Sequence, residues 1–407
     1  MSENQNKPVI RFEGFTDAWE QCRLGDVSTS FSGGTPTAGK KEYYGGSIPF
    51  IRSAEINSDV TELFITQEGL NSSSAKVVDV GDILYAMYGA TSGEVGIARI
   101  SGAINQAILS VKPNAGYDAK FIMKWLRAQK QNITNTYLQG GQGNLSGNIV
   151  KDLEIKFPLK DEQTKIGSFF STLDHTITFH QRKLEKSKII KKAMLEKLFP
   201  KNGSDKPEIR FKGFTDAWDQ CELGKLGNTF TGLSGKTKED FGHGNAKFVT
   251  YVNVFNNPIA DSEALEAVEV DSKQNEVQYG DVFFTTSSET PEEVGMSSVW
   301  LNNSVNTYLN SFCFGYRPTE KFDPYYLAFM LRSSGVRKKF LFLAQGISRY
   351  NISKTKVMEM NIPVPSIDEQ VAIGNFFSTL DRTITFHQHQ LEKLQNIKKS
   401  LLEKMFV

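Results

Sequence analysis

Three short stretches of this sequence carry residues that could do chemistry. Ser234-Gly-Lys-Thr237 ends like a phosphate-binding loop, Asp152 with Glu154-Ile-Lys156 resembles a nuclease metal site, and Gly140 to Gly147 is rich in glycine. Each departs from the pattern that its chemistry requires. Phe230 occupies the first glycine of the phosphate loop, the carboxylates lie in an alternating run typical of an edge strand, and the glycines do not join a strand to a helix. We expect ordinary turns and strand residues there.

Histidines and cysteines do not form a metal site either. His387 and His389 are two residues apart on an expected helix, so their side chains point to different faces. Cys22 and Cys221 are matched copies in a repeat, beside tryptophans and without CxxC spacing, which favours small buried residues. The sequence therefore predicts no catalytic residue, no metal site and no cofactor bound by this chain.

The chain is written twice. Residues 10–27 return at 209–226 with 13 of 18 positions identical, and 161–199 return at 368–406 with 27 of 39 identical. The offset is 199 for the first pair and 207 for the second, so the intervening segment is longer in the second half. That intervening segment shares little identity between the halves. The repeat predicts one scaffold used twice to present two different faces.

The repeated C-terminal blocks have the pattern of long helices. Apolar residues follow three- and four-residue steps, and Lys and Arg gather toward the C-terminal turns, as the helix dipole prefers. Such a helix would be roughly 50 Å long and needs a partner to bury its narrow apolar seam. We expect the two helices to pack through Ile166, Phe169, Leu173, Ile177 and Leu184 in the first, and Ile373, Phe376, Leu380, Ile384 and Leu391 in the second.

The variable segments read as mixed α/β domains, since short β-rich runs bounded by Gly, Ser and Asn precede an amphipathic helix. The predicted organisation is a first domain at 1–160, a helix at 161–200, a polar linker at 201–208, a second domain at 209–367 and a helix at 368–407.

Composition sets the class of protein. The 407 residues carry 47 Lys and Arg against 46 Asp and Glu, and 39% are hydrophobic, as expected for a globular protein. No apolar run approaches the length of a membrane span, and the N-terminus is polar, so we expect a cytoplasmic protein without a membrane partner. The near-neutral charge argues against a partner held by bulk electrostatics alone.

The repeated blocks resemble those of the DNA-specificity subunits of type I restriction-modification enzymes. The resemblance rests on FTDAWEQCRLG (15–25), its copy FTDAWDQCELG (214–224) and the DEQ…FFSTLD…TITFHQ helices, and it covers residues 9–407. The turn at 81–93 and Asn105-Gln106 are also similar to segments of the family's target-recognition domains.

The resemblance implies an α+β fold: two mixed α/β target-recognition domains joined by two long antiparallel helices, with a pseudo-twofold internal repeat. It implies that each domain reads one half of a two-part site in double-stranded DNA. The helices would space the halves and dock two methyltransferase (modification) subunits, which restriction (motor-nuclease) subunits join. S-adenosylmethionine, ATP and Mg²⁺ would be bound by those partners. Two other classes stay open: a self-contained nuclease or methyltransferase, and a helical adaptor with two ligand- or protein-binding domains.

Bases are read by Arg, Lys, Asn and Gln, and phosphates by Lys, Arg, Ser and Thr. The expected contacts are the residues of these types in polar loops. In the first domain they are Lys40, Lys41, Tyr43, Thr91, Ser92, Gln142 and Asn144; in the second they are Lys236, Lys238, Arg337, Lys338, Lys339, Arg349, Tyr350 and Asn351. Arg349-Tyr350-Asn351 aligns with Gln142-Gly-Asn144 at offset 207, as different half-sites would demand.

Overall fold

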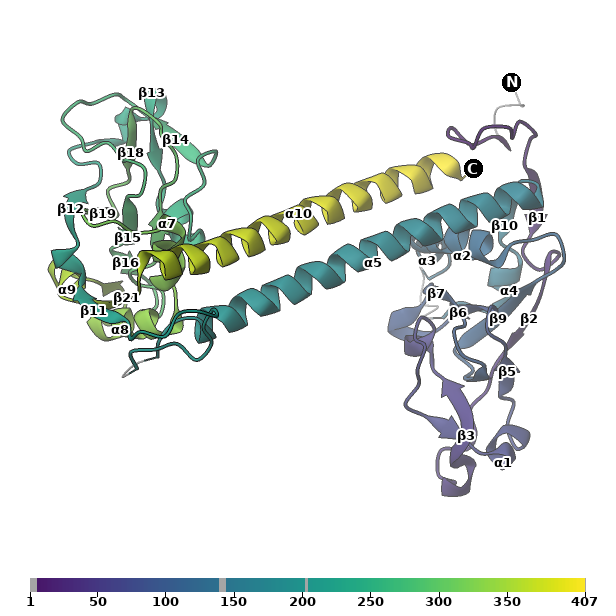
Figure 1. The fold of residues 1–407 in the computed structure, drawn as a ribbon. Helices are drawn as coiled ribbons and strands as arrows, with labels where there is room; N and C mark the ends of the chain where they lie inside the picture. Colours follow the sequence, from purple (N-terminus) through teal and green to yellow (C-terminus); the bar gives the residue numbers. More distant parts are fainter. Residues whose placement is uncertain (1–5, 139–143, 202–203, 407) are drawn as a thin grey trace. The chain divides into compact units, whose positions relative to one another are not determined.

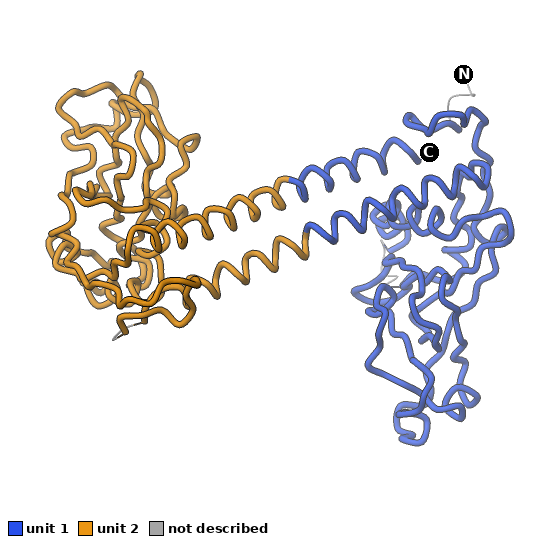
Figure 2. Tube along the Cα trace, viewed as in Figure 1, with its two compact units in different colours: residues 1–180, 390–407 blue, residues 181–389 orange. Residues whose placement is uncertain are grey.

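The computed structural model describes residues 6–138, 144–201 and 204–406. The chain divides into two compact units, shown in Figure 2. The first unit consists of residues 1–180 and 390–407, and the second of residues 181–389. Each unit therefore combines one variable domain with a segment of both C-terminal blocks of the repeat.

Both repeated blocks form long helices, as predicted. They are α5 (Lys160–Lys197) and α10 (Ile367–Met405), of 38 and 39 residues (Figure 1). Acidic residues occupy the first turn of each and a lysine the last, so both helices complement their own dipole. No helix among the described residues is long and apolar enough to cross a membrane.

The first variable domain is built on two four-stranded sheets and a two-stranded ribbon, with short helices beside them. One sheet has the order β2 (Ser28–Ser32), β9 (Ile108–Pro113), β6 (Ile83–Ala86), β7 (Val95–Ile97), and the other β4 (Phe64–Ile65), β3 (Tyr44–Ile51), β8 (Gly102–Ile104), β5 (Lys76–Val78). The ribbon pairs β1 (Glu20–Arg23) with β10 (Glu154–Phe157). The α-helices are α1 (Gln67–Asn71), α2 (Ala119–Ala128), α3 (Lys130–Tyr137) and α4 (Gly147–Lys151), and the 3-10 turns include η2 (Lys41–Tyr43), η3 (Ser53–Glu55) and η4 (Gly89–Thr91).

The second variable domain repeats this plan. One sheet has the order β12 (Gly227–Thr231), β19 (Cys313–Pro318), β15 (Val282–Thr285), β17 (Ser297–Val299), and the other β14 (Leu265–Val268), β13 (Phe241–Val249), β18 (Thr307–Leu309). Two ribbons pair β11 (Asp219–Glu222) with β21 (Asn361–Val364) and β16 (Ser287–Ser288) with β20 (Tyr350–Asn351). The helices are α6 (Tyr251–Asn256), α7 (Pro324–Met330), α8 (Ser334–Leu343) and α9 (Lys354–Met358), with 3-10 turns η5 (Leu223–Lys225) and η6 (Lys238–Asp240).

The fold repeats where the sequence does not. The orders β2-β9-β6-β7 and β12-β19-β15-β17 are equivalent, although these strands share little identity. A pair of glycines marks the equivalence at offset 199. A Cβ at Gly33 would lie 2.0 Å from the carbonyl oxygen of Ile104, and a Cβ at Gly232 would lie 2.0 Å from that of Asn310. The same close backbone approach is thus required in both domains.

Each unit has an aromatic core that includes the end of a long helix. In the first unit Trp19, Phe121 and Phe170 pack with Phe406, which follows α10. In the second unit the equivalent cluster contains Trp218, Tyr326, Phe377 and Phe199, the last of which follows α5. Burial of these rings anchors each long helix at both of its ends, because its first turns pack in one unit and its last turns in the other.

Within each unit the two helix segments run antiparallel. In the first unit Phe170 stacks on Phe406 while Asp174 pairs with Lys398 at 2.7 Å. A higher number on α5 thus meets a lower number on α10. The second unit shows the equivalent ion pair, Lys191 with Asp381 at 2.6 Å, at offset 207. These pairs show that α5 and α10 contact each other within each unit through equivalent ion pairs.

Candidate nucleic-acid interface

The candidate residues gather in two regions of each variable domain. The first region is the 3-10 turn that precedes the long interior strand of the second sheet, η2 before β3 and η6 before β13. The second region is the loop pair at the end of β6 or β15, where the chain returns toward the long helix. We call them the turn region and the loop region. Because both occur in both domains, the repeated fold places different side chains on equivalent positions.

In the turn region of the first domain, one lysine is engaged and one is free. Lys40 Nζ lies 3.0 Å from the hydroxyl of Tyr43, and its ammonium lies 4.9 Å from the centre of that ring. This hydrogen bond raises the pKa of Lys40 and lowers the pKa of Tyr43, whose side chain is buried. Lys41 is exposed, and no ion pair or hydrogen bond of its ammonium occurs within the described residues. Lys41 is therefore the better placed of the three to meet a phosphate.

The turn region of the second domain has the same division. Lys236 Nζ pairs with Asp271 at 3.1 Å and lies 3.9 Å from a carboxylate oxygen of Asp240. A backbone hydrogen bond from Lys273, reinforced by the side chains of Gln274 and Lys236, lowers the pKa of Asp271 to about 2. Lys238 is exposed, and its ammonium has no such partner in the described part of the chain. Lys41 and Lys238 both open a 3-10 turn, so they are equivalent free cations.

In the loop region of the first domain, the structure brings the 89–93 turn and Asn144 together. Asn144 forms an antiparallel bridge with Tyr88, one residue before that turn. Thr91 Oγ1 donates to the carbonyl of Tyr88, and the buried Ser92 donates to that of Met87. Both hydroxyls thus shape the turn, whereas the Asn144 side chain is exposed. Gln142 lies outside the described residues.

The loop region of the second domain is a hairpin. Gln345 and Asn351 exchange both backbone hydrogen bonds, at 2.9 and 2.8 Å, and close a turn of five residues, 346–350. Tyr350 and Asn351 then pair with Ser288 and Ser287 in a short ribbon. The bridge of Asn351 is equivalent to that of Asn144 at offset 207. Arg349 and Asn351 are exposed and Tyr350 is half-buried.

Arginine contacts separate structural from available side chains in the second domain. Residues 209–367 contain five arginines, all within the described part of the chain. Arg210 pairs with Glu369, and Arg317 pairs with Asp281. Arg332 donates to four backbone carbonyls within 3.0 Å, those of Val254, Phe255, Asn257 and Ser297. Only the guanidinium of Arg349 has no hydrogen bond or ion pair to a described residue. It is the arginine that a ligand could use without disrupting the fold.

The basic run at 337–339 is mostly committed to the fold. The Arg337 guanidinium donates to the carbonyls of Glu292, Val294 and Gly295 at 2.6 to 2.8 Å, and burial lowers its pKa to about 10. Lys339 Nζ donates to the carbonyl of Asn361, and burial lowers its pKa. Because these donors are already used, we do not carry Arg337 and Lys339 forward as DNA contacts. Lys338 is exposed, with no partner among the described residues.

One available cation was not foreseen from the sequence. Arg99 is exposed in the turn between β7 and β8, and its guanidinium has no hydrogen bond or ion pair within the described residues. It is an arginine in a short turn between two strands, between Ala98 and Ile100. Such a turn was a detectable signal, but its length gave no reason to prefer it over the longer polar loops.

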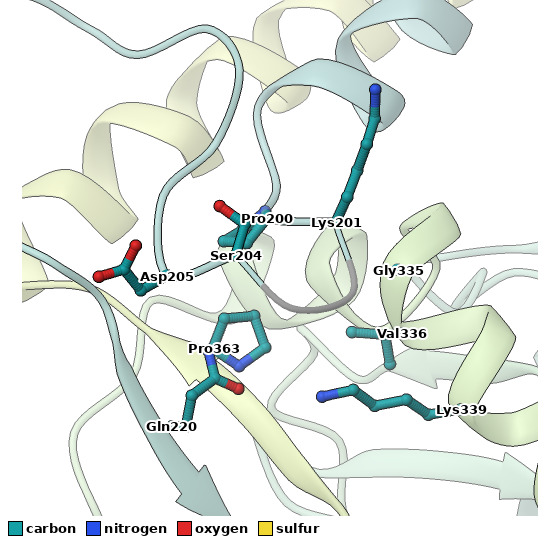
Figure 3. A pocket seen from close by; sticks show the side chains of 9 residues that line it. All are labelled: Pro200, Lys201, Ser204, Asp205, Gln220, Gly335, Val336, Lys339 and Pro363. Carbon is teal, nitrogen blue, oxygen red and sulfur yellow. The ribbon is translucent and has the colours of Figure 1, made fainter.

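A cavity of about 430 Å³ lies where the linker packs against the second domain (Figure 3). Its lining includes Pro200, Lys201, Gln220, Gly335 and Lys339, and a Cβ at Gly335 would lie 2.6 Å from the carbonyl oxygen of Pro200. This contact shows that the linker sits tightly on the start of α8. Within the described residues, no group of three or more His, Cys, Asp or Glu is placed to hold a metal ion.

The residues expected to pack the helices are all buried or partly buried. Ile166, Ile177 and Ile373 are buried, and Phe169, Leu173, Leu184, Phe376, Leu380, Ile384 and Leu391 are partly buried. Sequence reasoning missed the anchors of this arrangement. Arg11 holds Glu162 and Arg210 holds Glu369 through paired hydrogen bonds of 2.7 to 2.8 Å, and both carboxylates are almost fully buried. The signal was the Arg and the DEQ motif of each repeat.

Comparison with known proteins places these features in a family. The sequence model described as type I restriction modification DNA specificity domain matches residues 16–188 and again 215–396. A specificity subunit of the type I restriction enzyme MjaVIII from Methanocaldococcus jannaschii is 20% identical, over 94% of this chain and 91% of its own length. The HindI specificity subunit of Haemophilus influenzae is 30% identical over 39% of this chain and 37% of its own length.

The fold has a counterpart among solved structures. The crystal structure of the type I restriction-modification system S subunit from M. genitalium matches with a TM-score of 0.59 and 16% identity. The match covers 98% of this chain and 99% of that chain. Both the sequence match and the fold match therefore extend over the two variable domains and the two long helices.

Proposed function

Because the chain belongs to the type I restriction-modification DNA specificity family, we propose that it is the subunit that recognises the DNA target of a type I restriction-modification complex. Each variable domain reads one half of a two-part site in double-stranded DNA. The observation that carries the proposal is that the two variable domains share one fold but differ in the residues at equivalent loop positions. Asn144 and Asn351 hold equivalent bridges, while the residues two positions before them are Gln142 and Arg349.

The proposed reading uses the available side chains of the turn and loop regions. Lys41, Lys238 and Lys338 are compact exposed cations suited to phosphates. Arg349 and Asn144 are suited to base edges, since Arg pairs with guanine and Asn with adenine in the major groove. Arg99 joins this set as an exposed guanidinium of the first domain. Lys40, Thr91, Ser92 and Lys236 contact neighbouring groups of the turn and loop regions and so shape the segments that present these side chains.

The proposed role is non-catalytic. S-adenosylmethionine, ATP and Mg²⁺ act in the partners: two methyltransferase subunits, docked on the long helices, and the restriction subunits that join them. The relatives from M. jannaschii and H. influenzae are specificity subunits by name, which supports this division of labour. A net charge of +1 makes binding by the isolated chain weak, because few phosphates are neutralised without the partners.

The long helices act as a ruler in this proposal. A 38-residue helix is about 57 Å long at 1.5 Å per residue, which exceeds one turn of duplex at about 34 to 36 Å. In both units the segments of α5 and α10 run antiparallel and form equivalent ion pairs, so the two halves of the chain use the same helix packing. Two identical reading domains on this frame are therefore expected to recognise an inverted repeat, since site symmetry mirrors protein symmetry.

A chimera tests the proposal. Residues 28–160 are replaced by a second copy of 227–367, and the chain is co-expressed with its methyltransferase subunits. Modified bases are then mapped by single-molecule sequencing. We expect the native chain to direct modification to a two-part sequence, and the chimera to direct it to two inverted copies of one half. If the chimeric complex assembles and still modifies the native site, reading by the variable domains is refuted.

A binding assay separates the proposal from the adaptor alternative. The assembled complex is expected to shift a duplex that carries the mapped site, with an affinity that falls steeply as salt rises. The matched control is the same duplex with one half scrambled, which should bind more weakly. An adaptor for proteins or small ligands would distinguish neither duplex.

A further inference from the structure

The hairpin of the second domain carries the most exposed large apolar side chain of the described residues. Ile347, in the five-residue turn, is 95% exposed. Phe342, near the end of α8 and three residues before the hairpin closes, is 82% exposed. Arg349, the available guanidinium described above, stands two residues after Ile347 in the same turn. Two bare apolar side chains thus stand close in sequence to one free cation.

The turn that holds Ile347 is closely constrained. The paired hydrogen bonds between Gln345 and Asn351 fix its base. Gly346 has φ +140°, and a Cβ there would lie 2.1 Å from the carbonyl oxygen of Arg349. The backbone therefore doubles back on itself between these two residues, and only glycine fits. A constrained turn presents its side chains at low cost in conformational entropy, as recognition requires.

Neither apolar side chain contributes to the core. Phe340, two residues before Phe342, is fully buried and corresponds at offset 207 to the buried Ile133. The position equivalent to Phe342 is Asn135, an exposed polar residue. The scaffold position is thus apolar in both domains, while the exposed position is apolar in the second domain alone. Both side chains are therefore free to contact a ligand without loss of core packing.

We propose that Ile347, aided by the nearby exposed Phe342 of α8, contacts the C5-methyl group of a thymine in the half-site read by residues 209–367. In the major groove the thymine methyl is the apolar group that a base pair offers, and apolar side chains recognise it. Arg349 binds a neighbouring base or phosphate and holds the turn against the duplex. This inference rests on the proposed function and adds the chemistry of one position in the target.

The cation on the turn itself favours DNA as its occupant, although the exposed Glu289 and Glu292 lie on the loop that follows the paired Ser288. Arg349 and Lys338 are exposed cations without partners among the described residues. Glu293, on the facing segment, accepts hydrogen bonds from Ser288 and Thr290, so its carboxylate is held by its own loop. The turn also continues the loop region that the proposal assigns to base reading. A protein partner would instead need a larger apolar surface than two isolated side chains provide.

The test replaces thymine by uracil, which removes only the methyl group. The assembled complex is titrated with duplexes that carry the mapped site, in which each thymine is replaced singly by deoxyuridine. For the native complex we expect one position of this half-site at which replacement weakens binding about fourfold, the effect of one buried methyl group. Ile347→Ala should weaken binding to the thymine duplex by at least as much, and should then bind both duplexes equally. Phe342→Ala should reduce the thymine preference in part.

The controls use other exposed apolar residues. Val305, 81% exposed on a different loop, gives the variant Val305→Ala, which should keep native affinity and native thymine preference. Because Ile347 and Phe342 are exposed, their alanine variants should keep the native unfolding midpoint.

Three outcomes overturn the inference. If the native complex binds its site but no deoxyuridine in this half-site weakens it, the methyl contact is absent although the proposed function stands. If Ile347→Ala retains the native thymine preference, another residue reads the methyl. If Ile347→Ala prevents assembly with the methyltransferase subunits, the turn is a protein contact. Failure of the native complex to bind any mapped site would refute the proposed function itself.

Discussion

The ring of Phe406, just after α10, stacks on the ring of Phe170 in α5 with centroids 5.8 Å apart and planes 24° from parallel. The second unit repeats the relationship in Phe199 and Phe377, at 5.9 Å and 14°. Each stack lies in a core that contains the tryptophan present in both copies of the repeat, Trp19 in the first unit and Trp218 in the second. Phe406, which follows α10, is therefore a core residue of the unit in which α5 begins. Phe199, which follows α5, is a core residue of the unit in which α10 begins.

Removal of either end-of-helix ring should destabilise its own unit. Phe406→Ala and Phe199→Ala each leave a cavity among aromatic rings, which typically costs about 3 to 5 kcal/mol in the free energy of unfolding. Chemical denaturation with a probe in each unit would measure the loss. The matched control is Phe342→Ala, whose ring is exposed and whose removal should change stability little. Equal effects of the buried and exposed substitutions would contradict this account.

The two equivalent aspartates of the helix pair should differ in importance. Asp174 contacts Lys124, Lys398 and, at 3.8 Å, Arg127, and the Lys124 side chain is only 4% exposed. Asp381 pairs with Lys191 alone among the described residues, at a more open site. Asp174→Asn leaves a buried lysine without its counter-charge and should cost about 3 kcal/mol. Asp381→Asn should cost about 1 kcal/mol or less.

The destabilisation caused by Asp174→Asn should disappear in acid. Burial raises the pKa of Asp174, but hydrogen bonds from Lys124 and Lys398 outweigh it, so its pKa is lowered from the ordinary value. A lowered carboxyl pKa contributes stability above the unfolded pKa of about 3.9, and that stability is lost as the pH falls through the folded pKa. The gap between native chain and Asp174→Asn should be constant near neutral pH and shrink below about pH 4. A gap that widens in acid would reverse the assignment.

The two buried glutamates should respond unequally to loss of their arginines. Glu369 also accepts a hydrogen bond from Trp218 Nε1 at 3.1 Å, whereas Trp19 Nε1 finds no partner among the described residues. Arg11→Ala therefore strips Glu162 of its main donor and should cost about 3 to 5 kcal/mol. Arg210→Ala leaves Glu369 one donor and should cost less. Denaturation of the two variants side by side decides the order, and the reverse order would show that the tryptophan bond is weak.

The sequence predicted the frame better than the interface. The helices at 161–200 and 368–407 begin within one residue of the observed Lys160 and Ile367, because a long apolar period is a local signal that the sequence itself carries. The three- and four-residue steps selected Phe169 and Phe376, whereas their neighbours Phe170 and Phe377 are fully buried. At its start each helix packs on a domain as well as on its partner helix, so its buried face is wider than one seam.

Long-range contacts explain why the interface was harder to predict. Arg337 and Arg349 look alike in the sequence, as basic residues in or near polar loops. The partners of Arg337 are backbone carbonyls of residues 292–295, more than 40 positions away, and no local pattern announces them. The isolated Arg99 failed to stand out for the converse reason. Whether a cationic side chain can bind a ligand depends on whether the folded chain already pairs it. Composition alone does not show this.

The position of Phe406 has a consequence for synthesis on the ribosome. Domains generally fold as units while the chain emerges at about 5 to 20 residues per second. The core of the first unit is incomplete until residues 390–406 have been made. These residues are made after every residue of the second unit. The domain that is translated first is thus completed last. Its aromatic core therefore stays incomplete during the translation of 181–389.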